Sequence, residues 1–411
     1  MTKILVVGLN FQPEITGIGK YTGEMAAYLS SKGHQVRVIT TPPYYPYWKV
    51  QPGYRWWKYR REIWSGVEIY RCPLWVPRNP SGIKRIFHLL SFSLSSLPVL
   101  LTQIFWGPQI VLCVAPALFS APVALLIARL CRARAWLHLQ DFELDAATRL
   151  GMLGSGNFLT RLVASGESWL LGAFDRVSTI SDRMLARLEQ KGVHLDRTCF
   201  FPNWVDTEAV FPLPDSPESL RKDFSIPTDK IIILYSGNMG NKQGLEVLVE
   251  AAKELRVDSG IHFVLCGEGS ARADVERAAE DMRNIQFLPL QPPEKFNQLL
   301  NAADIHVLPQ RADAADLVMP SKLLGMLASG KPVIAIANPG TEIGTVVGQI
   351  GVLVPPGNQF ALCEAIVKLA ESSQMRACMG QKGRAFVCEN WSNTRILSDF
   401  ELHMRQLVQG S

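Results

Sequence analysis

Glycine-containing turns follow apolar runs at points where a strand would hand over to a helix. Gly17 and Gly19 stand in "EITGIGKYTGEM", and Gly237 opens "GNMGNKQGLEVLVEA" in the second half of the chain. Glycines in such a turn let backbone N–H groups approach an anion at the positive end of a helix. A single pair of loop glycines is more often turn punctuation, but the pattern occurs in both halves and therefore favours a bound phosphate.

Polar side chains accompany the glycines of the second half. Asn238, Lys242 and Gln243 lie in the glycine loop itself, and Gly267 and Glu268 follow another apolar run in "FVLCGEGS". A lysine in this loop could supply a cation to a phosphate. The alternative is an ordinary solvated loop lysine.

The stretch "PSKLLGMLASG" predicts a helix that begins near Pro320, a residue suited to the first turn. Ser321 and Lys322 fall in that turn, where a lysine opposes the helix dipole unless an anion offsets it. Lys322 is therefore the best physical indication of phosphate, with a surface lysine as the alternative; Asp316 lies just before the helix. Gly325 costs the helix roughly 0.5–1 kcal/mol relative to alanine, so it opens space beside a ligand or permits close helix packing.

A second polar group follows the apolar run "ARAWLHL" in the first half. His138, Gln140 and Asp141 stand at the end of this predicted strand, where side chains face a ligand site. Asp141 could accept a proton or orient a hydroxyl group, or it could cap the helix that follows. The histidines show no spacing typical of a metal site, so no metal is expected.

Short apolar runs alternate with helix-length segments along the whole chain, which predicts an α/β fold with two facing doubly wound Rossmann-like domains. Ligands of such sheets bind beyond the carboxyl ends of the strands, here in the cleft between the domains. The predicted strands of the first half are 3–8, 35–40, 109–115, 133–139, 175–180 and 198–203. Those of the second half are 231–237, 261–267, 284–290, 304–310, 332–338 and 351–357.

The length of 411 residues also favours two domains. We place them at 1–205 and 206–385, followed by a helical segment, 386–411, that returns toward the first domain, and the Pro-rich stretch 210–228 marks the passage between them. The first 200 residues hold 23 Lys and Arg against 12 Asp and Glu, or +11, and the remainder hold 19 against 25, or −6. This asymmetry indicates an anionic partner of the first half, either a membrane surface or a phosphorylated ligand; no motif supports nucleic acid.

Residues 86–128 contain no Asp, Glu, Lys or Arg, and 86–106 is about as long as a membrane span. A buried helix, a spanning helix and an interfacial helix are the alternatives. Upstream, 47–64 interleaves Trp, Tyr, Lys and Arg as membrane-surface segments do, or forms a solvated loop. We prefer peripheral association with a membrane. Unpaired cysteines in apolar runs and an N-terminus that enters a strand directly indicate a cytoplasmic protein, so this surface would be the inner face of the plasma membrane.

Several motifs together resemble the retaining family-4 glycosyltransferases with the GT-B fold, above all those of colanic-acid biosynthesis and related fucosyltransferases. They are "PEITGIGKY", "GNMGNKQGLE", "FPNWVDTEAVF", "CGEG", "AADIHVLPQ" and "PSKLLGMLASGKPVIA", spread over nearly the whole chain. The resemblance implies that 206–385 binds a nucleotide-sugar and that 1–205 binds the acceptor. The donor-side residues are then Gly17, Gly19, Gly237, Asn238, Gln243, Gly267, Glu268, Asp316, Ser321 and Gly325; His138 and Gln140 lie on the acceptor side; Asp141, Lys242 and Lys322 are catalytic.

The chain departs from the pattern of that family at several positions. The E-x7-E pair of the family falls on Leu317 and Gly325, so neither acid is present. Its Arg and Lys after the first strand of the second domain fall on Asn238 and Gln243, with Lys242 one residue early. The chain is thus a divergent active branch, which we favour, or an inactive relative.

The resemblance implies transfer of a sugar, with retention and without metal or other cofactor, from a nucleoside diphosphate to a lipid-linked or growing saccharide. GDP-fucose is the first expectation for the donor and a UDP-sugar the second. A sugar-nucleotide 2-epimerase and a catalytically silent subunit of a polysaccharide assembly complex are the alternatives.

Overall fold

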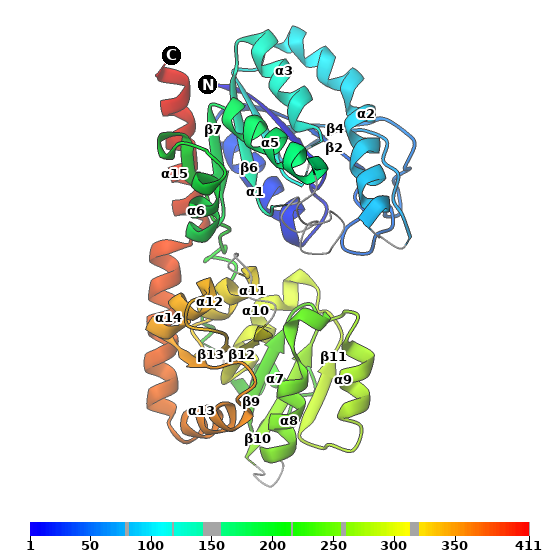
Figure 1. Cartoon of the computed structure of the whole chain (residues 1–411). Helices are drawn as coiled ribbons and strands as arrows, with labels where there is room; N and C mark the ends of the chain where they lie inside the picture. Colours follow the sequence, from blue (N-terminus) through cyan, green and yellow to red (C-terminus); the bar gives the residue numbers. More distant parts are fainter. Residues whose placement is uncertain are drawn as a thin grey trace. The chain divides into compact units, whose positions relative to one another are not determined.

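The computed structural model describes residues 1–78, 82–116, 119–142, 158–214, 217–255, 260–312 and 320–410. The chain divides into two units. The first unit comprises Met1–Pro202 together with Leu397–Ser411, and the second comprises Asn203–Ile396. Each unit contains one sheet with helices around it (Figure 1).

The sheet of the first unit has eight strands in the order β3-β4-β2-β1-β5-β6-β7-β8, all parallel to their neighbours except β3. The central strands are almost wholly buried and apolar, as expected of a parallel sheet covered on both faces. The strands are β1 (Lys3–Gly8), β2 (Gln35–Thr40), β3 (Arg60–Trp64), β4 (Val67–Arg71), β5 (Ile110–Val114), β6 (Arg134–Leu139), β7 (Arg176–Thr179) and β8 (Thr198–Phe200).

Strand order reverses between β1 and β5, so right-handed crossovers place helix α1 on the face opposite to helices α2, α3 and α5. The C-terminal helix α15 lies on the same face as α1. Its Phe400 packs on Trp136 with 4.9 Å between ring centroids, and its Glu401 Oε1 lies 3.2 Å from His34 Nε2. The helices are α1 (Gly17–Ser31), α2 (Gly82–Trp106), α3 (Ala121–Cys131), α5 (Phe158–Ala173), α6 (Asp182–Gln190), η1 (Leu195–Arg197) and α15 (Asn393–Gln409).

The second unit has a six-stranded parallel sheet in the order β11-β10-β9-β12-β13-β14. Its strands are β9 (Ile231–Ser236), β10 (Ile261–Cys266), β11 (Ile285–Leu288), β12 (Ile305–Pro309), β13 (Val333–Ile336) and β14 (Val352–Val354). Its helices are α7 (Pro217–Lys222), η2 (Asn241–Gln243), α8 (Glu246–Glu254), α9 (Arg272–Ala278), α10 (Pro293–Ala302), α11 (Ser321–Ala328), α12 (Glu342–Ile350), α13 (Gln359–Glu371) and α14 (Ser373–Asn390).

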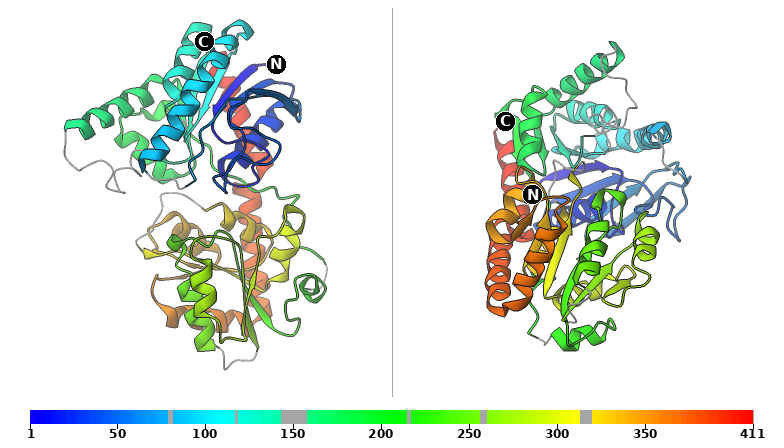
Figure 2. Two further views of the ribbon diagram at one scale, coloured as in Figure 1. Left: turned by 90° about the vertical axis from the view of Figure 1, so that its right-hand side faces the viewer. Right: turned by 60° about the horizontal axis from the view of Figure 1, so that its bottom comes forward.

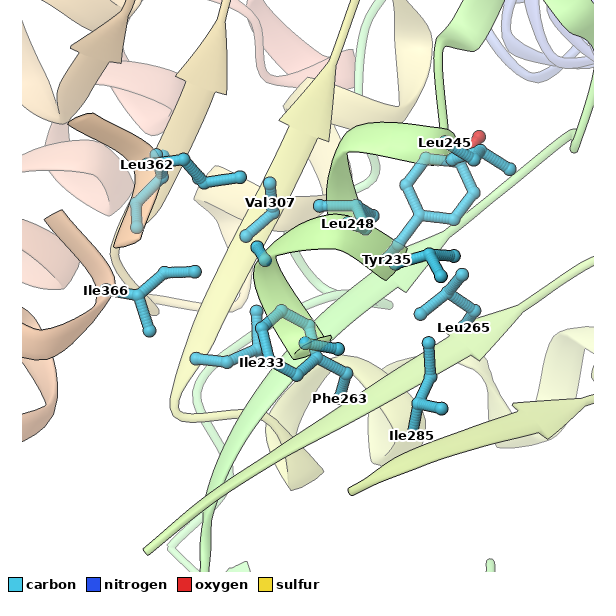
Figure 3. Packing of buried hydrophobic residues seen from close by; sticks show 14 of the residues in the cluster. Ile233, Tyr235, Leu245, Leu248, Phe263, Leu265, Ile285, Val307, Leu362 and Ile366 are labelled. Carbon is cyan, nitrogen blue, oxygen red and sulfur yellow. The ribbon is translucent and has the colours of Figure 1, made fainter. Parts of the chain in front are cut away.

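One hydrophobic core of this unit lies between the sheet and helices α8 and α13. Figure 3 shows Ile233, Phe263 and Val307 from the central strands beside Leu248 of α8 and Ile366 of α13. Tyr235 belongs to the same cluster and is buried. The core therefore fixes the end of β9, where the candidate site begins.

The predicted fold class is confirmed, and each predicted apolar run contains a strand. The alternative of a solvated loop over 47–64 is wrong at the end of this segment, because β3 pairs with β4 in an antiparallel hairpin. Ser65 and Gly66, both at positive φ, form the two-residue turn that such hairpins use.

Three further expectations need correction. The passage between the units does not fall at 210–228, because the units divide between Pro202 and Asn203, and Val210, Leu220 and Phe224 lie in hydrophobic clusters of the second unit. The cysteines are all free thiols, as expected, but Cys378 is exposed rather than in the core. The segment 86–106 is helical within α2, and much of that helix is exposed rather than buried.

Candidate active site

The candidate site of the second unit lies where its strand order reverses, between β9 and β12. Loops that leave the carboxyl ends of two such strands run in opposite directions and leave a crevice between them. The loop after β9 begins at Gly237, and helix α11 follows β12 in the chain. The sequence therefore places Gly237 and Lys322 on either side of the same switch point.

Bare backbone lines the strand ends here. A Cβ added to Gly267 would lie 1.8 Å from the carbonyl oxygen of Gly237, so only glycine fits. The two loops are also joined by backbone hydrogen bonds: the Gly237 N–H donates to the Cys266 carbonyl (2.9 Å), and the Met239 N–H donates to the Glu268 carbonyl (2.8 Å). The strand ends of β9 and β10 thus form one rigid backbone surface.

Lys322 reaches from the first turn of α11 to this surface. Its Nζ donates to Tyr235 Oη at 3.0 Å and to Gln243 Oε1, and it lies 4.8 Å from the centroid of the Tyr235 ring. A Cβ on Gly237 would come within 3.2 Å of the Lys322 side chain. Burial lowers the pKa of Lys322 from 10.5 to about 8. These partners are neutral and do not cancel its charge, so an anion placed here would gain from it.

The other polar candidates lie in the loop after β9 and at the start of α11. Asn238 is exposed, and its carbonyl accepts a 2.6 Å hydrogen bond from Tyr235 Oη. Ser321 is the exposed first residue of α11, and Lys242 lies in η2 beside Gln243. Asp316 lies outside the described residues.

Three residues that the sequence did not single out complete this site. Tyr235 holds Lys322, as described above. The side chain of Arg311 lies over Gly244, where an added Cβ would be 2.8 Å from its Cγ. Arg272 donates to Glu268 Oε1 and to the Gly267 carbonyl, both at 2.6 Å, so the carboxylate of Glu268 is already paired.

Gly325 lies against helix α10. It is buried, and an added Cβ would lie 3.4 Å from Phe296 Cζ and 3.6 Å from Leu300 Cδ1, both on α10. The position thus faces α10, where a methyl group would make ordinary contacts, so packing does not require a glycine here. Its contact with a ligand stays a prediction.

The first unit also gathers polar groups beyond its switch-point strand β1. Gly17 is the first residue of α1 and has a φ of 63°, a value that favours glycine. Gly19 is required for space, since an added Cβ would lie 2.6 Å from Oε2 of the buried Glu14. Glu14 Oε1 accepts the N–H groups of Tyr44 and Tyr45, each at 2.9 Å, and its Oε2 accepts from Asn10.

Burial raises the pKa of Glu14, and its hydrogen bonds act in the opposite direction. The carboxylate ties the loop after β1 to the loop after β2. Beyond it, Tyr44 Oη donates to His88 Nε2 at 3.0 Å, because His88 Nδ1 is engaged with the carbonyl of Trp75 at 2.7 Å. These groups hold the loops that present Gly17.

The third group of predicted residues follows β6. His138 Nδ1 lies 2.9 Å from Ser178 Oγ, and its Nε2 lies 3.2 Å from Gln140 Nε2. Burial lowers the pKa of His138 to about 3, so its ring is neutral near pH 7 and accepts from Gln140. Asp141 is exposed and accepts a 2.8 Å bond from the Phe142 N–H. This bond to the next residue tests neither role: the helix that Asp141 would cap lies outside the described residues, so capping and the orientation of a hydroxyl group both stay predictions.

Comparison with known proteins agrees with this geometry. A glycosyl transferase 4-like domain matches residues 16–204, and a glycosyl transferases group 1 domain matches 216–386. WcaI of Escherichia coli (strain K12), named as a colanic acid biosynthesis glycosyl transferase, is 44% identical over 372 residues, which cover 89% of this chain and 91% of WcaI. The chain belongs to the family-4 type of GT-B glycosyltransferases.

Solved structures share the fold of this glycosyltransferase. Sucrose-phosphate synthase from Thermosynechococcus elongatus is 18% identical, with a TM-score of 0.78 over the full length of both chains. HepE from Anabaena, solved with UDP and glucose, is 16% identical with a TM-score of 0.68, over 99% of this chain and all of HepE. At these identities the likeness concerns the fold.

In the described part of the glycosyltransferase, no group of three or more His, Cys, Asp or Glu side chains is placed to hold a metal ion. The metal independence expected from the sequence stays a prediction.

Proposed function

We propose that this glycosyltransferase moves a sugar from a nucleoside diphosphate to a hydroxyl group of a lipid-linked or growing saccharide during assembly of a colanic-acid-type exopolysaccharide. The similarity to WcaI over most of both chains supports the pathway. HepE, which shares the fold, was solved with UDP and glucose. GDP-fucose is the first candidate for the donor and a UDP-sugar the second.

Lys322 carries the proposal. Its ammonium group is partly desolvated, is held by the neutral Tyr235 and Gln243, and lies at a helix start beside the bare backbone of Gly237. A diphosphate that leaves its sugar gains negative charge, and preorganised cations and N–H groups stabilise such charge best where water is scarce. The donor diphosphate would therefore lie against Lys322, with Lys242 nearby in η2.

The remaining donor contacts follow the same logic. The first turn of α11 at Ser321 offers a backbone N–H group, and Asn238 and Gln243 offer amides. Gly237 and Gly267 would instead let the diphosphate approach the backbone closely, because their own N–H groups already donate to Cys266 and Leu288. Glu268 would act through its main chain, because Arg272 holds its carboxylate. Gly17 and Gly19 offer the corresponding helix start in the first unit.

The acceptor would bind to the first unit, where Asp141 orients its hydroxyl group and His138 holds Gln140 as a neutral base. Retention would proceed on one face of the sugar, with the leaving phosphate taking the acceptor proton, so no protein nucleophile, metal or other cofactor is invoked. The enzyme would act in the cytoplasm at the inner membrane face, independently of nucleic acid.

Transfer can be tested with the purified full chain, radiolabelled GDP- and UDP-sugars, and a lipid extract of bacterial membranes. We expect label from one donor to enter the lipid fraction, and we expect this transfer to be insensitive to EDTA. In an NMR spectrum of the product, the new linkage should keep the anomeric configuration of the donor. Epimerised donor without transfer would show an epimerase instead. Donor binding without any turnover, across all donors and extracts, would show a silent subunit.

A further inference from the structure

Helix α2 buries several polar residues and exposes several large apolar ones. Besides Phe92 and Leu100, its buried side carries His88, Ser93, Ser96 and Gln103, and each of these four has a hydrogen-bond partner. Ser93 lies 2.9 Å from Ser120, Ser96 donates to the Ser93 carbonyl, and Gln103 accepts from Arg37 at 3.0 Å. A surface helix of a soluble protein normally shows the reverse arrangement.

The outward side of α2 is a stripe of large apolar residues. At 3.6 residues per turn, these residues fall within about 40° of one another around the helix axis. The neighbouring helix α3 adds Leu126 and Leu130, which are also exposed, and the two helices lie side by side (Figures 1 and 2). The α2 stripe consists of Ile83 (70% exposed), Phe87 (59%), Leu94 (72%), Leu101 (42%) and Phe105 (94%). We call these seven residues the outer apolar face.

Positive charge and aromatic rings border this face. The chain has no Asp or Glu between Glu68 and Asp141, whereas Lys84 and Arg85 are exposed at the start of α2. The segment 54–64, with exposed Trp56, Trp57 and Lys58, is fastened to α2 by a 2.8 Å bond from Tyr59 Oη to the Ser95 carbonyl. Trp, Tyr, Lys and Arg around an apolar surface are typical of proteins that lie on an anionic bilayer.

We propose that the outer apolar face docks on the surface of an anionic lipid bilayer, with α2 lying in the interface rather than crossing it. This docking deepens the proposed function, because it names the surface that brings the enzyme to a lipid-linked acceptor. Only the identity of the acceptor rests on the proposed function.

The arrangement of charges and contacts selects this occupant. A second copy of the chain would bring the basic borders of two faces together, and their repulsion opposes that pairing. The length and composition of α2 would permit it to cross a membrane. Spanning, however, would strip His88 and Gln103 of the partners that they have in the first unit, at the cost of unpaired polar groups in hydrocarbon. An interfacial helix keeps these contacts and buries only the stripe.

Flotation of the full chain with vesicles tests the docking. We expect binding to vesicles of phosphatidylglycerol and phosphatidylethanolamine, weaker binding at high salt, and little binding to phosphatidylcholine. The double variant Leu94→Ser with Phe105→Ser should reduce the partition coefficient on the order of 10- to 100-fold, because two exposed apolar groups no longer enter the bilayer. The matched control is Phe360→Ser, which removes a side chain that is 74% exposed in the second unit and should leave partitioning unchanged.

A second double variant, Leu126→Ser with Leu130→Ser, keeps the test decisive if the first one melts at a lower temperature. It should weaken vesicle binding severalfold. Unchanged partitioning of both folded variants overturns the proposal, as does wild-type protein that resists carbonate extraction like a spanning protein. A dimer in sedimentation that the variants dissociate would show that the face is a self-interface. Vesicle binding does not depend on sugar transfer, so the two proposals can fail separately. Loss of vesicle binding with intact transfer to a detergent-dispersed acceptor would contradict only the docking, and vesicle binding without transfer would contradict only the proposed function.

Discussion

The two units each place a partly or wholly buried charge at the end of a switch-point strand, but they use the two charges differently. Glu14 in the first unit has both carboxylate oxygens engaged by backbone or amide N–H groups. Lys322 in the second unit donates to a hydroxyl group and an amide oxygen, and these two bonds use two of the three N–H groups of its ammonium. A buried charge whose two oxygens are both engaged organises the chain, whereas one with a donor to spare can serve a ligand.

The comparison predicts that Lys322 matters for the ligand and Glu14 for the fold. Both lie next to glycines whose missing side chains make room, namely Gly237 beside Lys322 and Gly19 beside Glu14. Sequence position alone would rank them as equals. The difference in their partners separates them, and substitutions at each position can break the distinction.

The largest effect is expected from Lys322→Ala. Loss of a preorganised cation at the leaving diphosphate should lower kcat on the order of 10²–10³-fold, measured in the transfer assay with saturating donor. Lys382→Ala, which removes an exposed lysine from α14, is the matched control and should keep full activity. Equal rates of the two variants would remove Lys322 from the mechanism.

Glu14→Ala should act on stability instead. It leaves the N–H groups of Tyr44 and Tyr45 without their acceptor, so the free energy of unfolding should fall by about 2–4 kcal/mol. Urea unfolding followed by tryptophan fluorescence measures this, because eight of the ten tryptophans belong to the first unit.

Glu24→Ala provides the matched control for Glu14. It removes a partly exposed carboxylate of α1 that lies 3.8 Å from Lys20, a pair worth less than about 1 kcal/mol. Binding of nucleoside diphosphate should be unchanged in both variants. A Glu14→Ala protein that unfolds like wild type but loses nucleotide affinity would show that Glu14 serves the ligand after all.

The sequence predicted the fold well, because buried parallel strands leave continuous apolar runs such as "KILVVG" and "IIILYSG". It missed the β3–β4 hairpin, whose strand β3 lies at the sheet edge and is rich in exposed and charged residues. Lys322 could be predicted because a lysine in the first turn of a helix is a local conflict.

The partners of Lys322 could not be predicted in the same way. Tyr235 lies far from it in sequence and meets it only because β9 and β12 are neighbours in the sheet. Arg311 over Gly244 is another contact of this kind. A local sequence pattern identifies a lysine whose charge opposes its helix dipole, whereas the strand order of the sheet decides which side chains contact that lysine.

The pH dependence of nucleotide binding sharpens the interpretation of Lys322. Its pKa is lowered to about 8, so it is protonated at pH 7 and mostly neutral at pH 9. A bound diphosphate favours the protonated form and raises this pKa, so the affinity for UDP or GDP should fall about tenfold between pH 7 and pH 9. Calorimetric titration at the two pH values measures the change. Lys322→Arg should bind with a much flatter pH profile, because arginine stays charged; an equally steep profile would assign the titration to another group.

The smallest effect is expected at Gly325, where the structure and the sequence interpretation diverge. An alanine Cβ would make ordinary contacts with Phe296 and Leu300, so Gly325→Ala should raise the free energy of unfolding by about 0.5–1 kcal/mol through helix propensity. Its affinity for nucleoside diphosphate should stay within about twofold of wild type, because the added methyl group faces α10. Gly325→Glu should lower stability by burying a carboxylate against the same two side chains. If Gly325→Ala instead changed nucleotide affinity severalfold without a change in stability, the missing side chain would belong to the ligand site and not to the packing of α11 on α10.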